Sequence, residues 1–268
     1  MLEKNKIKLF PIIVLNYITA SVFGLLFSKA NLSFNYLIQS NWLPVSSFLG
    51  FLFVIVFFTI GYSSQKVGLT ITSISTKMSV VIPILFSILF YNEEIYILKF
   101  IGIIIALLAL FLASYKGKKK ENLNRTYIFL PFLLFFGAGS IDSIVKYSQE
   151  EYLKNVDIIE FSAISFIFSV ITSLVVFIFL KNKFKQLILI KNLFWGISLG
   201  LANFASLYFT ILALNTNIFA SSIVFSIIST GIILISVIAG FKFFNEKIEP
   251  INWLGVALSV LAILILSV

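Results

Sequence analysis

Two charged side chains lie inside apolar stretches of the sequence, where they could bind a polar molecule or an ion. Lys77 lies within the apolar stretch 68–91, and Asp142 lies within the stretch 127–146. An ionised side chain near the centre of a bilayer costs at least about 2.5 to 3.5 kcal/mol on insertion scales, so it needs a partner or a water-filled cavity. Lys77 and Asp142 could pair with each other across such a cavity, and Asp142 could instead bind a proton or another cation.

The residues around Lys77 favour a helix that is interrupted inside the membrane. Ser75, Thr76 and Ser79 add hydroxyl groups, and Pro83 leaves the carbonyl group four residues before it without an N–H partner. A helix with these features is expected to bend, and interrupted helices line the binding sites of many transporters. The alternative is that Lys77 extends toward the membrane surface or forms a structural ion pair.

Asp142 follows a run of small residues, 137–140, that ends at Ser140. Small residues allow a neighbouring helix or a bound molecule to approach closely. Lys146 lies four residues beyond Asp142, so an ordinary ion pair within one helix is the alternative explanation of this carboxylate.

Three asparagines in apolar stretches, Asn16, Asn203 and Asn215, are weaker candidates. A buried amide more often joins two helices by a hydrogen bond than contacts a substrate. Gly196 and Gly200 form a G-x-x-x-G pattern, which predicts close helix packing. The candidate residues of a substrate or ion pathway are Lys77, Asp142, Ser75, Thr76, Ser79, Pro83, Ser140, Asn16 and Asn203.

The composition of the 268 residues excludes a soluble globular domain. Hydrophobic residues make up 60% of the chain and charged residues 12%, and the mean hydropathy is +1.07. The chain has no His and no Cys, and no phosphate-binding loop pattern, so the sequence offers no thiol chemistry, no Cys/His metal site and no ATP-driven step. We expect no enzyme, no resident cofactor or metal, and no nucleic-acid partner; the net charge of +9 is explained by basic loops.

Apolar runs bounded by charged residues predict an all-α integral membrane protein with nine transmembrane helices. The first run resembles a secretory signal, but a poor cleavage site follows it, so we expect a retained helix. The predicted helices span 8–28, 43–64, 68–91, 96–115, 127–146, 158–180, 193–214, 218–241 and 250–268.

The distribution of lysines predicts the orientation in a bacterial cytoplasmic membrane. With a cytoplasmic N-terminus, nearly all basic loop residues lie on the inner side. The outer side then holds only Lys29, Lys99, Lys146 and Lys154. Nine helices place the C-terminus outside.

The sequence contains an internal repeat. Residues 90–95 (FYNEEI) match residues 243–248 (FFNEKI), and the match continues at the same spacing through Gly102 and Gly255. The two copies run in opposite directions across the membrane, which is the inverted-repeat arrangement of many transporters. Residues 1–115 form a first repeat of four helices, 116–126 a basic cytoplasmic linker, and 127–268 a second repeat of five helices.

The first repeat lacks a counterpart of the opening helix of the second. We expect either that translation begins upstream of Met1 or that the protein works with nine spans.

This pattern resembles the EamA family of the drug/metabolite transporter superfamily. The resemblance rests on the two inverted repeats, on residues 61–68 and 75–83, and on the Asn-Glu turns Asn92-Glu93 and Asn245-Glu246; Ser236 stands where the repeat would place a second Pro. It implies ten helices and alternating-access transport of small metabolites. The missing first helix and the external C-terminus depart from the family.

We therefore expect a secondary transporter of a small metabolite, with a proton or another cation as the coupling ion if one is used. The lipid bilayer and the substrate are its expected partners, and the short loops are compatible with a homodimer. The alternatives are a membrane subunit that requires a partner chain, or a flippase for a lipid-linked carrier. Glu93 and Glu246 are expected to lie in capped or solvated turns at helix ends.

Overall fold

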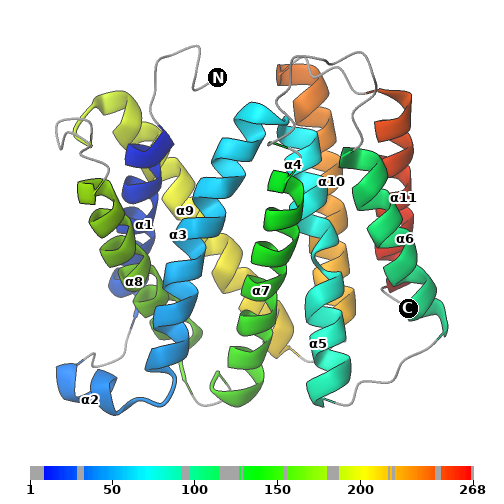
Figure 1. Cartoon of the computed structure of the whole chain (residues 1–268). Helices are drawn as coiled ribbons and strands as arrows, with labels where there is room; N and C mark the ends of the chain where they lie inside the picture. Colours follow the sequence, from blue (N-terminus) through cyan, green and yellow to red (C-terminus); the bar gives the residue numbers. More distant parts are fainter. Residues whose placement is uncertain are drawn as a thin grey trace. The chain divides into compact units, whose positions relative to one another are not determined.

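The fold is built from α-helices, and the described residues contain no strand (Figure 1). The structure is a computed structural model that describes residues 9–28, 33–91, 97–114, 127, 129–153, 156–179, 187–216, 218, 221–244 and 249–266, without the side chains of residues 34, 99, 114 and 222. The linker 116–126, Glu93 and Glu246 lie outside these residues. The helices are α1 (Leu9–Phe27), α2 (Phe34–Gln39), α3 (Leu43–Lys66), α4 (Leu69–Met78), α5 (Val81–Tyr91), α6 (Ile97–Ser114), α7 (Phe129–Glu151), α8 (Ile158–Phe179), α9 (Ile190–Asn215), α10 (Ser221–Phe244) and α11 (Pro250–Leu266).

The lengths of these helices confirm a multi-pass membrane protein. Within the described residues, seven helical segments are long and apolar enough to cross a bilayer, and α4 and α5 count together as one of them, Leu69–Tyr91. Two shorter apolar helical stretches, Phe100–Ala113 in α6 and Pro250–Leu266 in α11, accompany the seven. Each of the nine predicted helices therefore has a helical counterpart, although two of these counterparts fall short of the spanning length.

The observed helix boundaries differ from the predicted ones in three places. The predicted helix 68–91 is divided at Ser79–Val80, and the short helix α2 was not predicted. Helix α7 continues beyond residue 146 to Glu151, because the polar side chains of its last turns are satisfied within the helix: Lys146 Nζ donates hydrogen bonds to Gln149 Oε1 (3.1 Å) and Glu150 Oε1 (2.6 Å).

The chain forms two compact units, and each takes residues from both halves of the sequence. Unit 1 comprises Met1–Phe58 and Ile144–Asn217, and unit 2 comprises Thr59–Ser143 and Ile218–Val268. Helices α3 and α7 each begin in one unit and end in the other. The division by contacts thus differs from the division into sequence repeats at 115 and 127.

Unit 1 is organised around α1, which packs against both α8 and α9. Glycines allow the helices to approach closely: a Cβ atom on Gly200 would lie 2.5 Å from the Asn16 carbonyl oxygen, and one on Gly24 would lie 2.8 Å from Ala163 Cβ. A Cβ atom on Gly196 would collide with Leu15 Cβ. These contacts confirm the packing role predicted for Gly196 and Gly200.

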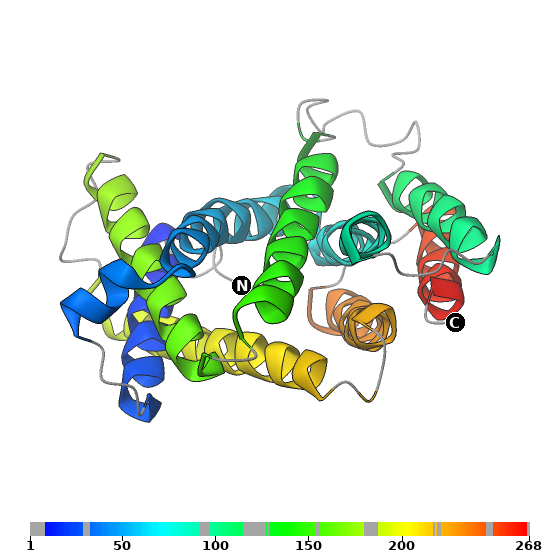
Figure 2. The same cartoon turned by 90° about the horizontal axis from the view of Figure 1, so that it is seen from below.

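Unit 2 contains the tightly packed pair α6 and α11, which lie side by side in Figures 1 and 2. A Cβ atom on Gly255 of α11 would lie 2.5 Å from the Ala113 backbone nitrogen. Asn252 Nδ2 donates hydrogen bonds to the carbonyl oxygens of Leu112 (3.1 Å) and Ala113 (2.9 Å) in the last turn of α6. Helix α10 packs against α4 and α11, which places it beside the interrupted helix.

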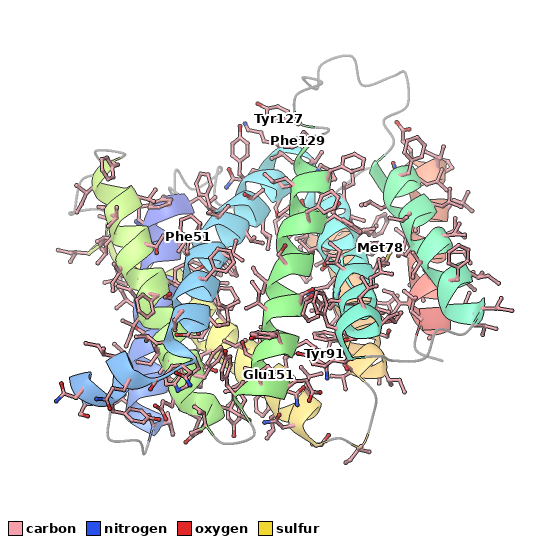
Figure 3. All side chains as sticks on the ribbon, turned by 60° about the horizontal axis from the view of Figure 1, so that its bottom comes forward. Phe51, Met78, Tyr91, Tyr127, Phe129 and Glu151 are labelled. Atoms are coloured by element: carbon pink, nitrogen blue, oxygen red, sulfur yellow. The ribbon has the colours of Figure 1, made fainter. Side chains whose placement is uncertain are left out.

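An aromatic cluster joins the end of α3 to the residues that precede α7 within unit 2. The rings of Tyr62 and Tyr127 meet edge to face at 6.1 Å, and Lys66 Nζ lies 5.9 Å from the centroid of each ring. Figure 3 shows Tyr127 and Phe129 together at the start of α7. The cluster holds the charge of Lys66 over aromatic faces, a favourable cation–π arrangement.

Candidate functional site

The interruption between α4 and α5 is the main irregularity within the spanning segments of unit 2. Ser79 adopts φ −58° and ψ −14°, and its backbone N–H bonds to the Lys77 carbonyl oxygen, so the last turn of α4 is tighter than an α-helix. The Ile82 N–H bonds to the Ser79 carbonyl oxygen at 2.8 Å. In a continuous α-helix the Ser79 carbonyl oxygen would accept a hydrogen bond from the N–H of residue 83, but proline has no backbone N–H. Pro83 therefore explains the interruption of the helix that the sequence predicted at this place.

Lys77 stands at this interruption, in the last turn of α4, and it is half-buried. Asp142 of α7 is also half-buried, and the charge of Lys77 acts on its carboxyl group, although the structure records no ion-pair contact between these two described side chains. Both residues belong to unit 2. The structure therefore brings together the two charged candidates, which are 65 residues apart in the sequence.

Close packing of α7 against the start of α5 brings Asp142 near the interruption. A Cβ atom on Gly139 would lie 2.7 Å from Ile82 Cβ, so no larger residue fits there without a shift. Gly139 lies three residues before Asp142, nearly one turn along the same helix. This is the close helix approach expected from the small residues 137–140.

The hydroxyl groups near Lys77 are buried and bonded to their own helix. Ser75 Oγ donates to the Ile71 carbonyl oxygen at 2.8 Å, Thr76 Oγ1 to that of Ser73 at 3.0 Å, and Ser79 Oγ to that of Thr76 at 2.5 Å. These hydroxyls satisfy carbonyl groups close to the interruption, and each oxygen keeps a lone pair that could accept a further hydrogen bond.

Other candidates lie apart from this pair. Ser140 is exposed, and its hydroxyl group bonds to the Phe136 carbonyl oxygen at 2.9 Å. Lys146 forms an ion pair with Glu150, with Nζ 2.6 Å from Oε1. The sequence spacing had instead offered Asp142 as the partner of Lys146.

The asparagines belong to unit 1 and join helices or loops there. Asn203 Nδ2 donates to Asn16 Oδ1 at 3.3 Å, which links α9 to α1, and Asn215 Nδ2 donates to the Leu153 carbonyl oxygen at 3.4 Å. Asn16 Nδ2 is buried and has no hydrogen-bond partner among the described residues. The Asn16–Asn203 contact is an interhelical hydrogen bond, the structural role that the sequence predicts for buried amides more often than substrate contact.

Two buried polar groups were missed by the sequence reasoning. Ser226 of α10 and Glu160 of α8 each have a buried side-chain oxygen without a hydrogen-bond partner among the described residues. Ser226 carries no sequence signal beyond its position in an apolar helix. Glu160 does carry one, because it is an acidic residue two positions after the start of an otherwise apolar helix.

Taken together, the helices and the charged pair define a multi-pass α-helical membrane protein with a polar, interrupted helix in unit 2. No family model matches the chain. The chain is 30% identical over 266 residues to an uncharacterized protein of Haemophilus influenzae, covering 97% of this chain and 89% of the relative. The chain belongs to the same family as this Haemophilus protein.

Proposed function

We propose that the protein is a secondary transporter that moves a small polar or amphipathic metabolite across the cytoplasmic membrane. The proposal rests chiefly on one observation: Lys77, at the interruption between α4 and α5, interacts with Asp142 of α7 inside spanning segments of one unit. Interrupted helices that carry charged residues at this depth are typical of transporter binding sites. The pattern that resembles the EamA family supports the same function.

Lys77 supplies the cationic wall of the proposed site, which favours an anionic or zwitterionic substrate. Asp142 neutralises Lys77 when no substrate is bound, so the buried charge is never left alone. An incoming anionic group competes with Asp142 for Lys77, and Asp142 is then free to accept a proton or the cationic end of a zwitterion. The two residues come from different sequence repeats, as expected for a site formed by inverted repeats.

The finer topology belongs to this proposal. Nine spans in a bacterial cytoplasmic membrane, a cytoplasmic N-terminus and an external C-terminus agree with the lysine distribution. Alternating access then consists of a movement of one repeat against the other around the pair.

A ligand screen tests the proposed site. We expect a compound of one chemical class to raise the thermal unfolding temperature of the purified protein in proportion to its concentration over Kd. The shift should disappear in Lys77→Met and in Asp142→Asn, and it should remain in the control Lys66→Met, which removes a lysine of the same unit at the end of α3. A shift that survives in both site variants would contradict the site. Failure of every compound to bind would instead favour a partner-dependent subunit.

A further inference from the structure

Glu160 is a buried carboxyl group that the proposed transport site does not use. It lies in the first turn of α8 in unit 1. Only 3% of the residue is exposed, and Oε1 has no hydrogen-bond partner in the described part of the chain. Ionising a carboxyl group in this state costs free energy, because neither water nor a hydrogen-bond donor compensates the charge at Oε1.

The short helix α2 covers this carboxyl group. The Tyr36 hydroxyl group lies beside Glu160 and interacts with its carboxyl group, while Tyr36 as a whole is 42% exposed. Trp42 is buried, and its ring packs 6.0 Å from that of Phe161, the next residue of α8. Among the described residues, aromatic side chains therefore lie near Glu160, and the Tyr36 hydroxyl group is the neutral group that interacts with its carboxyl group.

No positive charge compensates Glu160 within the described residues. The titratable groups that act on it are Tyr36 of α2 and the exposed carboxylate of Asp157, which repels a second negative charge. Helices α1, α3 and α9 pack on α8. Their described titratable residues are Tyr17, Tyr62, Lys66, Lys191 and Tyr208, and none of these has an interaction with Glu160 that the structure records. Lys29 and Lys154 lie outside the described residues.

We propose that Glu160 is a proton-binding site that holds its proton while α2 covers it and exchanges the proton when Tyr36 moves away. Protonation transfers one proton from hydronium to a carboxylate oxygen, and a water molecule is left. The neutral acid then needs no counter-ion, which fits the unpaired oxygen and the aromatic cover. If the transport function proposed above is correct, on which this last step rests, the proton at Glu160 is the coupling ion.

Infrared difference spectroscopy on the full chain in lipid tests the protonation directly. We expect a protonated-carboxyl C=O band in the wild type at neutral pH that is lost in Glu160→Gln. The band should remain in Asp157→Asn and in Asp142→Asn, which serve as matched controls. In Tyr36→Phe the band should persist to more alkaline pH, because the hydroxyl group that stabilises the ionised form is removed.

The contradicting result is a carboxylic-acid region that is identical in the wild type and in Glu160→Gln at neutral pH. This would show that Glu160 is ionised at neutral pH. Glu160→Gln is close in size to glutamic acid and carries no charge, so its thermal unfolding temperature should match that of the wild type at neutral pH. A marked loss of stability in this variant would equally contradict a protonated Glu160.

A transport assay separates this proposal from the proposed function. In proteoliposomes, Glu160→Gln should retain substrate exchange and lose the acceleration that a pH gradient gives to the wild type. If the infrared band is present but the wild type transports nothing, the proton site stands and the transport function fails. If Glu160→Gln responds to the gradient as the wild type does, the proton at Glu160 is not the coupling ion.

Discussion

At the scale of single residues, the central feature is a lysine and an aspartate whose opposite charges interact inside spanning helices. Each is half-buried, so neither carries the full cost of a charge in hydrocarbon, yet each loses part of its hydration and is stabilised by the opposite charge of the other. Removing one side chain leaves the charge of the other uncompensated, whereas removing both leaves no charge at this place in the membrane. Stability and binding should therefore respond differently to the same substitutions.

A double-mutant cycle tests this pair. We expect Lys77→Met and Asp142→Asn each to lower the free energy of unfolding, and the double variant to be more stable than the sum of the two effects predicts, with a coupling energy of about 1 kcal/mol. Transport should be lost in all three variants while the protein still reaches the membrane. Additive losses of stability would contradict a direct interaction, and wild-type transport in Asp142→Asn would exclude Asp142 from the mechanism.

Two residues show where sequence reasoning reaches its limit at this scale. Lys146 has an acidic residue four positions away on each side, and the sequence gives no reason to choose Glu150 over Asp142. Glu160 resembles an ordinary polar residue at a helix start. Its neighbour Tyr36 lies on α2, a helix of six residues that has no long apolar run. Side-chain packing decides both cases, and packing is not visible in the periodicity of a sequence.

At the scale of elements, the interrupted helix and its counterpart in the sequence repeat behave differently. Segment 69–91 divides at Ser79–Val80, whereas α10 continues without interruption from Ser221 to Phe244. The repeat places Ser236 at the position that corresponds to Pro83. One proline therefore accounts for the interruption in the first copy, and its replacement by Ser236 accounts for the continuous second copy.

Exchanging these residues tests the explanation. Ser236→Pro should lower the free energy of unfolding by about 3 kcal/mol, because proline inside a helix removes a hydrogen bond and collides with the preceding turn. Pro83→Ala should leave stability unchanged or increase it, and should weaken ligand binding, because the added N–H allows α4 and α5 to join. Thermal unfolding and ligand-dependent shifts measure both effects. A strongly destabilised Pro83→Ala would show that the interruption does not depend on the proline.

Two glycines of unit 2 form a matched pair for testing the helix packing. A Cβ atom on Gly255 would lie 2.5 Å from the Ala113 backbone nitrogen, whereas one on Gly231 of α10 would meet nothing within 4 Å. We expect Gly255→Ala to be destabilising, because α6 and α11 must separate. Gly231→Ala should be neutral or stabilising by up to about 1 kcal/mol, since alanine favours a helix. Equal effects on thermal unfolding would contradict the close packing of α6 and α11.

At the scale of the whole molecule, length and hydropathy were enough to predict the long apolar helical segments, but neither α2 nor the grouping of the helices. A spanning helix requires about 20 apolar residues, so its position can be read from a continuous run. The compact units instead depend on which helices touch. Unit 2 combines Thr59–Ser143 with Ile218–Val268, a combination that no contiguous segment of sequence reveals. The same grouping brings Lys77 and Asp142 together, which the sequence offered only as one of several pairings.

The most direct test of the transport proposal uses the absence of cysteine from the chain, which allows a single Thr76→Cys substitution next to Lys77 to be labelled without background. A membrane-impermeant maleimide reacts with the thiolate, which forms only where water reaches the side chain. Leu107→Cys on α6, where Leu107 is 46% exposed in an apolar segment, is the control expected to face lipid and to remain unlabelled. For an alternating-access transporter we predict labelling of the cysteine at position 76 from each side of the membrane in turn. Labelling from neither side, or from one side only, would contradict the account.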